Sequence, residues 1–396
     1  MTPETTSPLM RAVSLWTGIG VAAVAAGCGQ DGPPEAGAGG SAPVDIVEPA
    51  EMSVGTAEGA ETEEFYNVRD PFLLEGGELV VPVAGHREIR VFNQDGEKVR
   101  QYGGGGEGPG EFRGLLQAWP RGDTVEVWDG LLSRMTRFPP EGDPEVVSLR
   151  EGDAPLSTVV GVLDDGWLVG YVRIPSPGAR DELVADRFNG EGERVEREVV
   201  AVSGMQRVAY LDGGGGPGAL SPRARFQFGS SEESNGIYTA ETLTPEVRVL
   251  DPETGDTLRT ISWDPPDTPG PEEAFERLLS EARERGVEDE RSVLGEGAPP
   301  DTVPSFSDFL VDEEGLVWVR PFVPKRDARG LGGNVGTGPT GPGGHWEIFS
   351  PEGDPLGSVE MPEGLIPYQV TSDRLVGVHR DELGVERVRV HRVERP

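Results

Sequence analysis

Short apolar runs separated by glycine- and proline-containing turns dominate the chain from about residue 65 onward. Five turn segments align with one another. In each, a β-like run ends in Phe or Leu, a turn with Gly beside Asn, Asp, Pro or Glu follows, and apolar alternation resumes after a charged residue. Such turns predict β-hairpins, because Gly supplies positive φ while Asn, Asp and Pro pre-form the turn. The segments are VFNQDGEKV (91–99), RFPPEGDPEV (137–146), RFNGEGERV (187–195), VLDPETGDTL (249–258) and IFSPEGDPLGSV (348–359).

Another strand-like run precedes each of these segments, and a sixth copy closes the chain as RLVGVH (374–379) and ERVRVHRV (386–393). The preceding runs cover 78–83, 124–129, 167–172, 236–241 and 316–321. Further apolar segments come before many units, at 115–119, 157–163, 308–312 and 366–370. About four strands in each of six units predict an all-β, six-bladed propeller of four-stranded antiparallel blades. The alternative is a β-sandwich, which gives no reason for six recurrences in one order.

Three longer gaps, 204–234, 264–311 and 322–344, are interpreted as insertions within or between blades. One of them contains the single clear helix, at about 271–286, where Phe275, Leu278, Leu279 and Ala282 follow helical spacing. We expect this apolar stripe to pack on the propeller, and a lid over one face is the alternative.

The last copy leaves no room for a fourth strand before Pro396. We therefore predict that a segment within 44–68 supplies the outer strand of the last blade, which removes an exposed edge.

The N-terminus has the pattern of an export signal. Arg11 precedes an uncharged run, 12–27, which is shorter than the roughly 20 apolar residues that span a bilayer. Cys28 follows this run and is the only cysteine, so the sequence contains no disulfide. The next segment is rich in Gly, Ala, Pro and Glu, which is typical of a flexible tether. The expected organisation is a signal peptide over 1–28, a tether over 29–60 and the propeller over 61–396.

The composition excludes some classes of function and of fold. The 396 residues carry a net charge of −35, with a sequence pI of about 4.4. So acidic a chain is repelled by phosphate backbones, and we expect no nucleic-acid partner. The 58 glycines and 36 prolines favour many short elements joined by turns over a helical bundle.

The stretch GGGGEGPGEF (103–112) contains G-x-G-x-x-G at Gly103, Gly105 and Gly108. A dinucleotide loop of this kind opens a helix whose N-terminus faces the phosphates. Pro109 and Gly110 follow at once, and no helical period comes after them. The stretch is therefore interpreted as a structural turn between the first two blades.

Two motifs carry a family resemblance. The first is Gly106 to Phe112 with the strands that follow, which resembles the NHL-type repeat, in particular that of the bacterial six-bladed β-propeller lipoproteins. That resemblance covers about 65–395, and Phe112 is expected to lie between adjacent sheets. The second is Ala25-Ala26-Gly27-Cys28, which resembles the bacterial lipobox. It implies a lipid on Cys28, attachment to a membrane in the cell envelope on the periplasmic or cell-surface side, and, since residue 29 is Gly rather than Asp, the outer membrane.

No catalytic or cofactor-binding residue is predicted. The histidines, His86, His345, His379 and His391, have no metal-ligand spacing, so packing or rim roles are expected. The acidic clusters 288–290 and 312–314 are interpreted as solvated loops. Trp128, Trp167, Trp318 and Trp346 lie in predicted strands and are expected in the core between blades.

The functional hypothesis is a lipid-anchored binding or scaffolding module, monomeric, with a protein or small-molecule ligand. The alternative is a hydrolase resembling the gluconolactonase and strictosidine-synthase group, with a divalent cation in the central channel. A third hypothesis is an accessory protein of nutrient uptake at the outer membrane. Fold alone does not decide among them.

Overall fold

The arrangement of the predicted strands is seen in a computed structural model of the chain. The described residues are 44–56, 64–149, 158–173, 180–209, 215–217, 220–221, 223–229, 235–265, 269–284, 302–322, 342–381 and 383–395. The predicted signal peptide and Cys28 lie outside these residues. Among the described residues, no helix is both long and apolar enough to cross a bilayer.

Six antiparallel sheets form the six blades, as the sequence predicts, and each has at least four strands. Blade 1 has β3 (Phe72–Leu73), β4 (Leu79–Val83), β5 (Glu88–Phe92) and β6 (Lys98–Gly103). Blade 2 has β7 (Leu115–Arg121), β8 (Thr124–Asp129), β9 (Arg134–Phe138) and β10 (Glu145–Ser148). Blade 3 has β11 (Thr158–Leu163), β12 (Gly166–Arg173), β13 (Arg180–Asn189), β14 (Arg194–Ala209) and the short β15 (Gly215–Pro217).

The remaining blades follow in chain order. Blade 4 has β16 (Ala224–Gly229), β17 (Gly236–Glu241), β18 (Glu246–Leu250) and β19 (Thr257–Ser262). Blade 5 has β20 (Phe306–Val311), β21 (Val317–Pro321), β22 (Gly344–Phe349) and β23 (Pro355–Met361). Blade 6 has β24 (Leu365–Val370), β25 (Arg374–Arg380) and β26 (Glu386–Glu394), with β1 (Asp45–Ile46) and β2 (Met52–Val54) from the other end of the chain.

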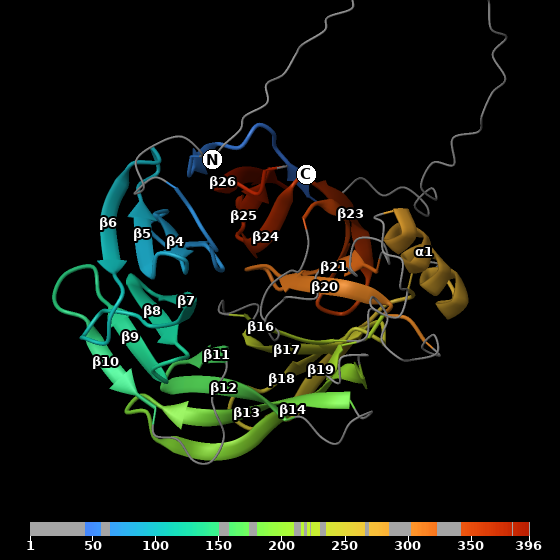
Figure 1. Cartoon of the computed structure of the whole chain (residues 1–396), viewed down its shortest axis with the longest axis horizontal. Coiled ribbons are helices and arrows are strands. Elements are labelled where there is room, and N and C mark those ends of the chain that lie inside the picture. Colours follow the sequence, from blue (N-terminus) through green and yellow to red (C-terminus); the bar gives the residue numbers. More distant parts are fainter. Residues whose placement is uncertain are drawn as a thin grey trace, which may run out of the picture. The chain divides into compact units, whose positions relative to one another are not determined.

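The ring closes through the N-terminal strands, which confirms that a segment within 44–68 completes the last blade. Figure 1 shows β1 and β2, in blue, beside the red strands of blade 6. Ile46 pairs with Val393, and Ser53 pairs with Arg389, so both strands lie on one edge of β26. Both strands also precede residue 61 and lie within the range given above to the tether.

The core lies between neighbouring blades, where large side chains from facing sheets meet. Trp128, Trp167, Trp318 and Trp346 are all fully buried, which confirms the expectation for them. Phe112 is fully buried against the sheets of blades 1 and 2, as expected. Each blade thus buries both of its faces only when its neighbours are present.

Glutamines on alternate innermost strands join neighbouring blades. Gln117 of β7 accepts a hydrogen bond from the backbone N–H of Val159 in blade 3, at 2.9 Å. Gln227 of β16 likewise accepts a hydrogen bond from the backbone N–H of Val311 in blade 5, at 2.7 Å. Gln369 of β24 accepts from Leu73 N in blade 1, at 2.7 Å. These bonds satisfy buried backbone donors that no strand pairing reaches, so they fix how the inner strands align around the ring.

The two longest connections begin and end on one face of the propeller. Because strands alternate in direction, the turns between second and third strands and the connections between blades share a face, here called the upper face. The connections 263–305 and 322–343 begin and end on it, whereas the turns within blades on the opposite face have at most six residues. Helix α1 (Pro271–Glu284) belongs to the first of these connections. Its Ala274 and Leu278 are buried with Leu220 and Phe322, and Leu279 is buried as well, so the expectation of packing is confirmed.

Two interpretations of the sequence need correction. The gap 204–234 is not only an insertion, because it contains β16, the innermost strand of blade 4. The cluster 312–314 is not simply a solvated loop. Asp312 is buried, and it accepts hydrogen bonds from Trp318 Nε1 at 3.0 Å and Arg395 Nη2 at 3.0 Å. Burial follows because this carboxylate has enough donors around it to replace water. The cluster 288–290 lies outside the described residues.

Candidate functional site

A group of polar side chains lies on the upper face where blade 6 meets blade 1. Arg69 and Asp70 precede β3, and Tyr368 lies on β24, so the group sits at the inner ends of the two blades. We call Arg69, Asp70 and Tyr368 the seam site. A β-bulge between Pro367 and Gln369 leaves Tyr368 as the extra residue of its strand. Bulges re-aim side chains and are frequent beside functional sites.

The backbone at Asp70 is strained. Its φ is +33°, in the left-handed region that residues other than Gly seldom adopt. Pro71 follows it, and a residue before proline ordinarily prefers an extended conformation. Strain of this kind persists where surrounding structure enforces it, and it is concentrated at functional sites.

The three side chains of the seam site lack partners among the described residues. Arg69 makes no side-chain hydrogen bond or ion pair there, although its Nε is buried. The Tyr368 hydroxyl has no hydrogen-bond partner there either, and the Asp70 carboxylate accepts only from its own backbone. A buried polar atom without a partner costs about 1–3 kcal/mol. The buried Nε of Arg69 therefore lowers stability, and a polar group retained at such a cost is a candidate for binding.

Ionisation within the seam site follows from burial. Burial raises the pKa of Asp70 to about 6, and the neighbouring Arg69 opposes that rise. Burial, with the Asp70 charge next in importance, also raises the pKa of Tyr368, which stays a neutral hydroxyl at physiological pH. Just beyond Tyr368, Arg380 Nη2 pairs with Glu386 Oε1 at 2.7 Å. Glu386 Oε2 in turn accepts a hydrogen bond from Val68 N at 2.8 Å. The pKa of Asp70 therefore lies about two units above its ordinary value.

Several other buried charges on the propeller are paired. At the inner ends of blades 4 and 5, Asp308 lies 2.7 Å from Arg225 Nη2 and 2.6 Å from Arg320 Nη2. Asp186 of blade 3 pairs with Arg194 at 3.0 Å. These carboxylates have the partners that buried charges require, so a structural role accounts for them.

The glycine-rich stretch 103–112 forms the structural turn that the sequence predicts. No helix follows it, since β7 comes next. A side chain at Gly103, where φ is +94°, would collide with Phe112 and with the backbone of residue 87. Glu111 accepts a hydrogen bond from Gly108 N at 2.8 Å, and Arg134 donates to the carbonyls of 107, 108 and 111. These bonds consume the polar groups that a phosphate would need.

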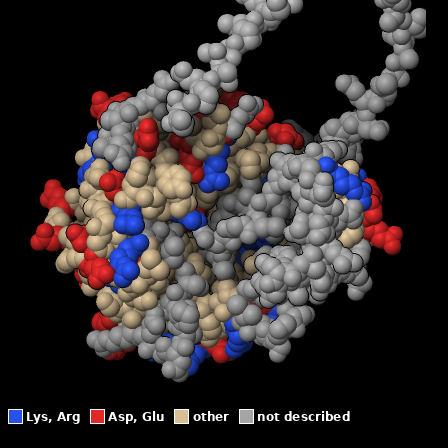
Figure 2. Space-filling view, in the orientation of Figure 1, with Lys and Arg blue, Asp and Glu red and all other residues tan. Residues whose placement is uncertain are grey.

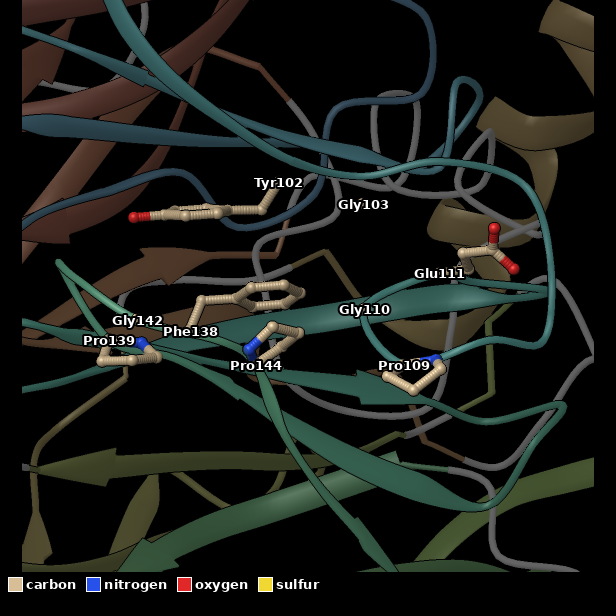
Figure 3. Close-up of a pocket in the computed structure, with 9 residues that line it drawn as sticks. All are labelled: Tyr102, Gly103, Pro109, Gly110, Glu111, Phe138, Pro139, Gly142 and Pro144. Carbon is tan, nitrogen blue, oxygen red and sulfur yellow. The ribbon is translucent and has the colours of Figure 1, made fainter.

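A shallow pocket of about 270 Å³ lies beside this turn (Figure 3). Tyr102 stacks on Phe138 with ring centroids 4.8 Å apart, and Pro109 and Pro144 line the same pocket. The carboxylate of Glu111 accepts a hydrogen bond from the backbone of its own turn. The pocket is open, and it has none of the unpartnered polar groups of the seam site.

Charge is unevenly distributed over the molecule. Figure 2 shows several patches of Lys and Arg surface toward the centre of the ring, while most Asp and Glu surface lies at the outer edge. This pattern applies to the described residues on the face shown.

Sequence comparison finds no matching family model and no matching curated protein. Comparison with solved structures does find matches. A member of the DUF4221 family from Bacteroides vulgatus is 9% identical, with 89% of this chain and 99% of that chain covered and a TM-score of 0.50. The likeness is one of fold.

Two other solved structures are similar at lower TM-scores. A Bacteroides fragilis protein for which export is inferred is 10% identical, with 89% and 95% covered and a TM-score of 0.47. Virginiamycin B lyase from Staphylococcus aureus is 8% identical, with 88% and 99% covered and a TM-score of 0.41.

The four histidines lie apart from the seam site's three residues. His86 contacts Arg90 at 2.9 Å, His345 pairs with Glu360 at 2.9 Å, and buried His391 contacts the carbonyl of Val47 at 3.2 Å. Burial lowers the pKa of His379 and of His391. In the part of the chain that the structure describes, no three His, Cys, Asp or Glu side chains are grouped as metal ligands.

The sequence analysis did not find the seam site. Its residues are 298 positions apart in the chain, from Asp70 to Tyr368, and none belongs to a motif. The signals that could have indicated it are weak: an Arg-Asp pair before a proline at the start of the first blade, and a tyrosine within the innermost strand of the last blade.

Proposed function

We propose that this chain is an extracytoplasmic binding module, held at a membrane by a lipid on Cys28, and that its ligand binds at the seam site on the upper face. The observation that carries the proposal is the set Arg69, Asp70 and Tyr368, in which the buried Nε of Arg69 has no partner among the described residues and is retained at a cost to stability. A binding role explains this cost, because a ligand supplies the missing partners. The rigid propeller holds the three side chains in place, which lowers the entropy cost of binding.

Replacement of Asp70 by Asn tests whether the seam site is kept for binding or for folding. Folding raises the pKa of Asp70 from 3.8 to about 6, so the folded protein holds this proton more tightly than the unfolded chain. The tighter binding of this proton therefore stabilises the folded state fully below about pH 4. This stabilisation is lost as the pH rises to about 6. Asp70→Asn should consequently stabilise the protein at pH 8 by about 1–3 kcal/mol, with little effect at pH 4.

Urea unfolding at both pH values measures this difference. Asp381→Asn is the matched control, because hydrogen bonds from Arg387 and nearby backbone groups lower the pKa of Asp381. That substitution should destabilise at pH 8, the opposite sign. A destabilised Asp70→Asn variant at pH 8 would mean that Asp70 serves the fold, and the binding proposal would lose its main support.

Lipid attachment has a direct test in the full-length chain. Because Cys28 is the only cysteine, Cys28→Ala should abolish labelling by radioactive palmitate and move the protein from the membrane to the soluble fraction of a Gram-negative host. Ser41→Ala, within the same predicted tether, is the control and should behave as the wild type. Palmitate labelling that survives in Cys28→Ala would refute the lipidation proposal.

A further inference from the structure

We infer that the seam site binds the carboxylate group of its ligand, and that one proton is taken up with it by Asp70. This inference rests on the proposed function, since it names the ligand chemistry of the same site. Its basis is the unpaired guanidinium of Arg69, the neighbouring carboxyl group of Asp70 and the hydroxyl group of Tyr368.

Arg69 is the group that selects the anion. Its guanidinium is always charged, and it offers several N–H donors in one plane, which match the two oxygens of a carboxylate. The arginines at Asp186 and Asp308 already have carboxylate partners, whereas Arg69 has none among the described residues. A ligand carboxylate would accept charge-assisted hydrogen bonds from the Arg69 guanidinium.

Tyr368 and Asp70 complete the receptor. The Tyr368 hydroxyl remains protonated and can donate a hydrogen bond to a ligand oxygen. Ionised Asp70 would repel the ligand, but protonated Asp70 becomes a second neutral donor. Since the folded protein already favours the protonated form up to a pH of about 6, taking up this proton is easy in mildly acidic solution.

The charged groups around Asp70 do not offer another explanation for such proton uptake. Arg69 is its charged neighbour, and Tyr368 faces it from β24. Beyond Tyr368, Arg380 of β25 and Glu386 of β26 are paired with each other. Burial raises the pKa of Asp70 to about 6 and keeps Tyr368 a neutral hydroxyl.

The test uses three carboxylates, each with a neutral counterpart: acetate and acetamide, glucuronate and glucose, N-acetyl-trialanine and N-acetyl-trialanine amide. They represent small acids, sugar acids and peptide C-termini. Calorimetry with the lipid-free mature chain, residues 29–396, at fixed ionic strength should show saturable binding of at least one carboxylate at pH 5.5 and none of its neutral counterpart. Above pH 6 the affinity should fall about tenfold per pH unit, as expected for uptake of one proton.

Variants separate the roles of the three residues. Arg69→Gln should weaken binding about tenfold to a hundredfold, while Arg113→Gln, an exposed arginine on the same face, should leave it unchanged. Asp70→Asn, which carries no titratable proton, should bind with the same affinity at pH 5.5 and pH 8. This variant also distinguishes Asp70 from His379, whose titration it leaves intact.

Three outcomes would overturn the inference. They are no saturable binding of any of the three carboxylates at pH 5.5, equal binding of the neutral counterparts, and a wild-type pH dependence retained in Asp70→Asn. Each would leave the broader binding proposal standing if Asp70→Asn is more stable than the wild type at pH 8. A destabilised Asp70→Asn together with carboxylate binding elsewhere would instead contradict the seam site itself.

Discussion

Removal of residues 1–56 should destabilise the propeller by about 5 kcal/mol or more, a loss comparable to the whole stability of many domains. The deletion takes away β1 and β2, and with them the buried side chains of Val44 and Val54. Each buried valine contributes about 1.5–3 kcal/mol through apolar burial. The hydrogen bonds of Val47 N and Glu51 N to the carbonyls of 392 and 390 are lost as well.

The same deletion leaves the outer edge of β26 without a partner. That strand, Glu386–Glu394, contains buried Val388, Val390 and Val393, which would then be exposed to water and to other chains. We expect a fall in melting temperature and concentration-dependent aggregation, measured by calorimetry and light scattering. Deletion of residues 1–40 is the matched control, because it spares both strands, and it should melt as the intact chain does. Equal melting of the two truncated chains would show that the N-terminal strands do not close the ring.

Replacement of Glu126 by Gln should destabilise the protein by about 3 kcal/mol, because it breaks a buried ionic group between blades 2 and 3. Glu126 is fully buried on β8. It pairs with Arg121 at 2.7 Å and with Arg137 at 2.9 Å, and it accepts a hydrogen bond from Trp167 Nε1 at 2.9 Å. The guanidinium of Arg137 also stacks over the Trp167 ring, 4.9 Å from its centroid. One neutral side chain cannot satisfy both arginines and the indole N–H.

A second glutamate beside Arg137 provides the control for this prediction. Glu145 is 64% exposed and lies 3.4 Å from Arg137, so Glu145→Gln should change the free energy of unfolding by less than about 0.5 kcal/mol. Urea unfolding with comparison of m-values measures both variants. A loss in Glu126→Gln no larger than that in Glu145→Gln would mean that the buried group adds nothing to the junction of the blades.

The sequence predicts much of this fold because propeller blades are local structures. A hairpin such as 91–99 contains its own turn residues and its own alternation, so its position can be predicted without knowledge of the neighbours. Phe112 and the strand tryptophans were assigned to the core correctly because large apolar side chains in strands have few other places to go. The closing strand within 44–68 was also predicted, since an unpaired edge at the last blade requires a partner.

The parts that were missed depend on neighbours distant in the chain. The innermost strand β16 lies in a segment read as an insertion, where ARFQFG is short and has two polar residues within it. Those polar residues make sense only in the assembled ring, where Gln227 bonds to the backbone of Val311 in the next blade. Asp312 was likewise assigned to a solvated loop, because its partner Arg395 comes 83 positions later.

By itself, the sequence determined the class of the fold, the number and order of the blades, the way the ring closes, and the structural nature of the glycine-rich turn. Periodicity, turn chemistry and apolar burial act over short stretches, and these decide such features. Only the tertiary structure decided that Arg69, Asp70 and Tyr368 meet, that they lack partners, and that Asp70 titrates near pH 6. Those properties arise from desolvation and mutual distance, which depend on how the first and last blades pack against each other.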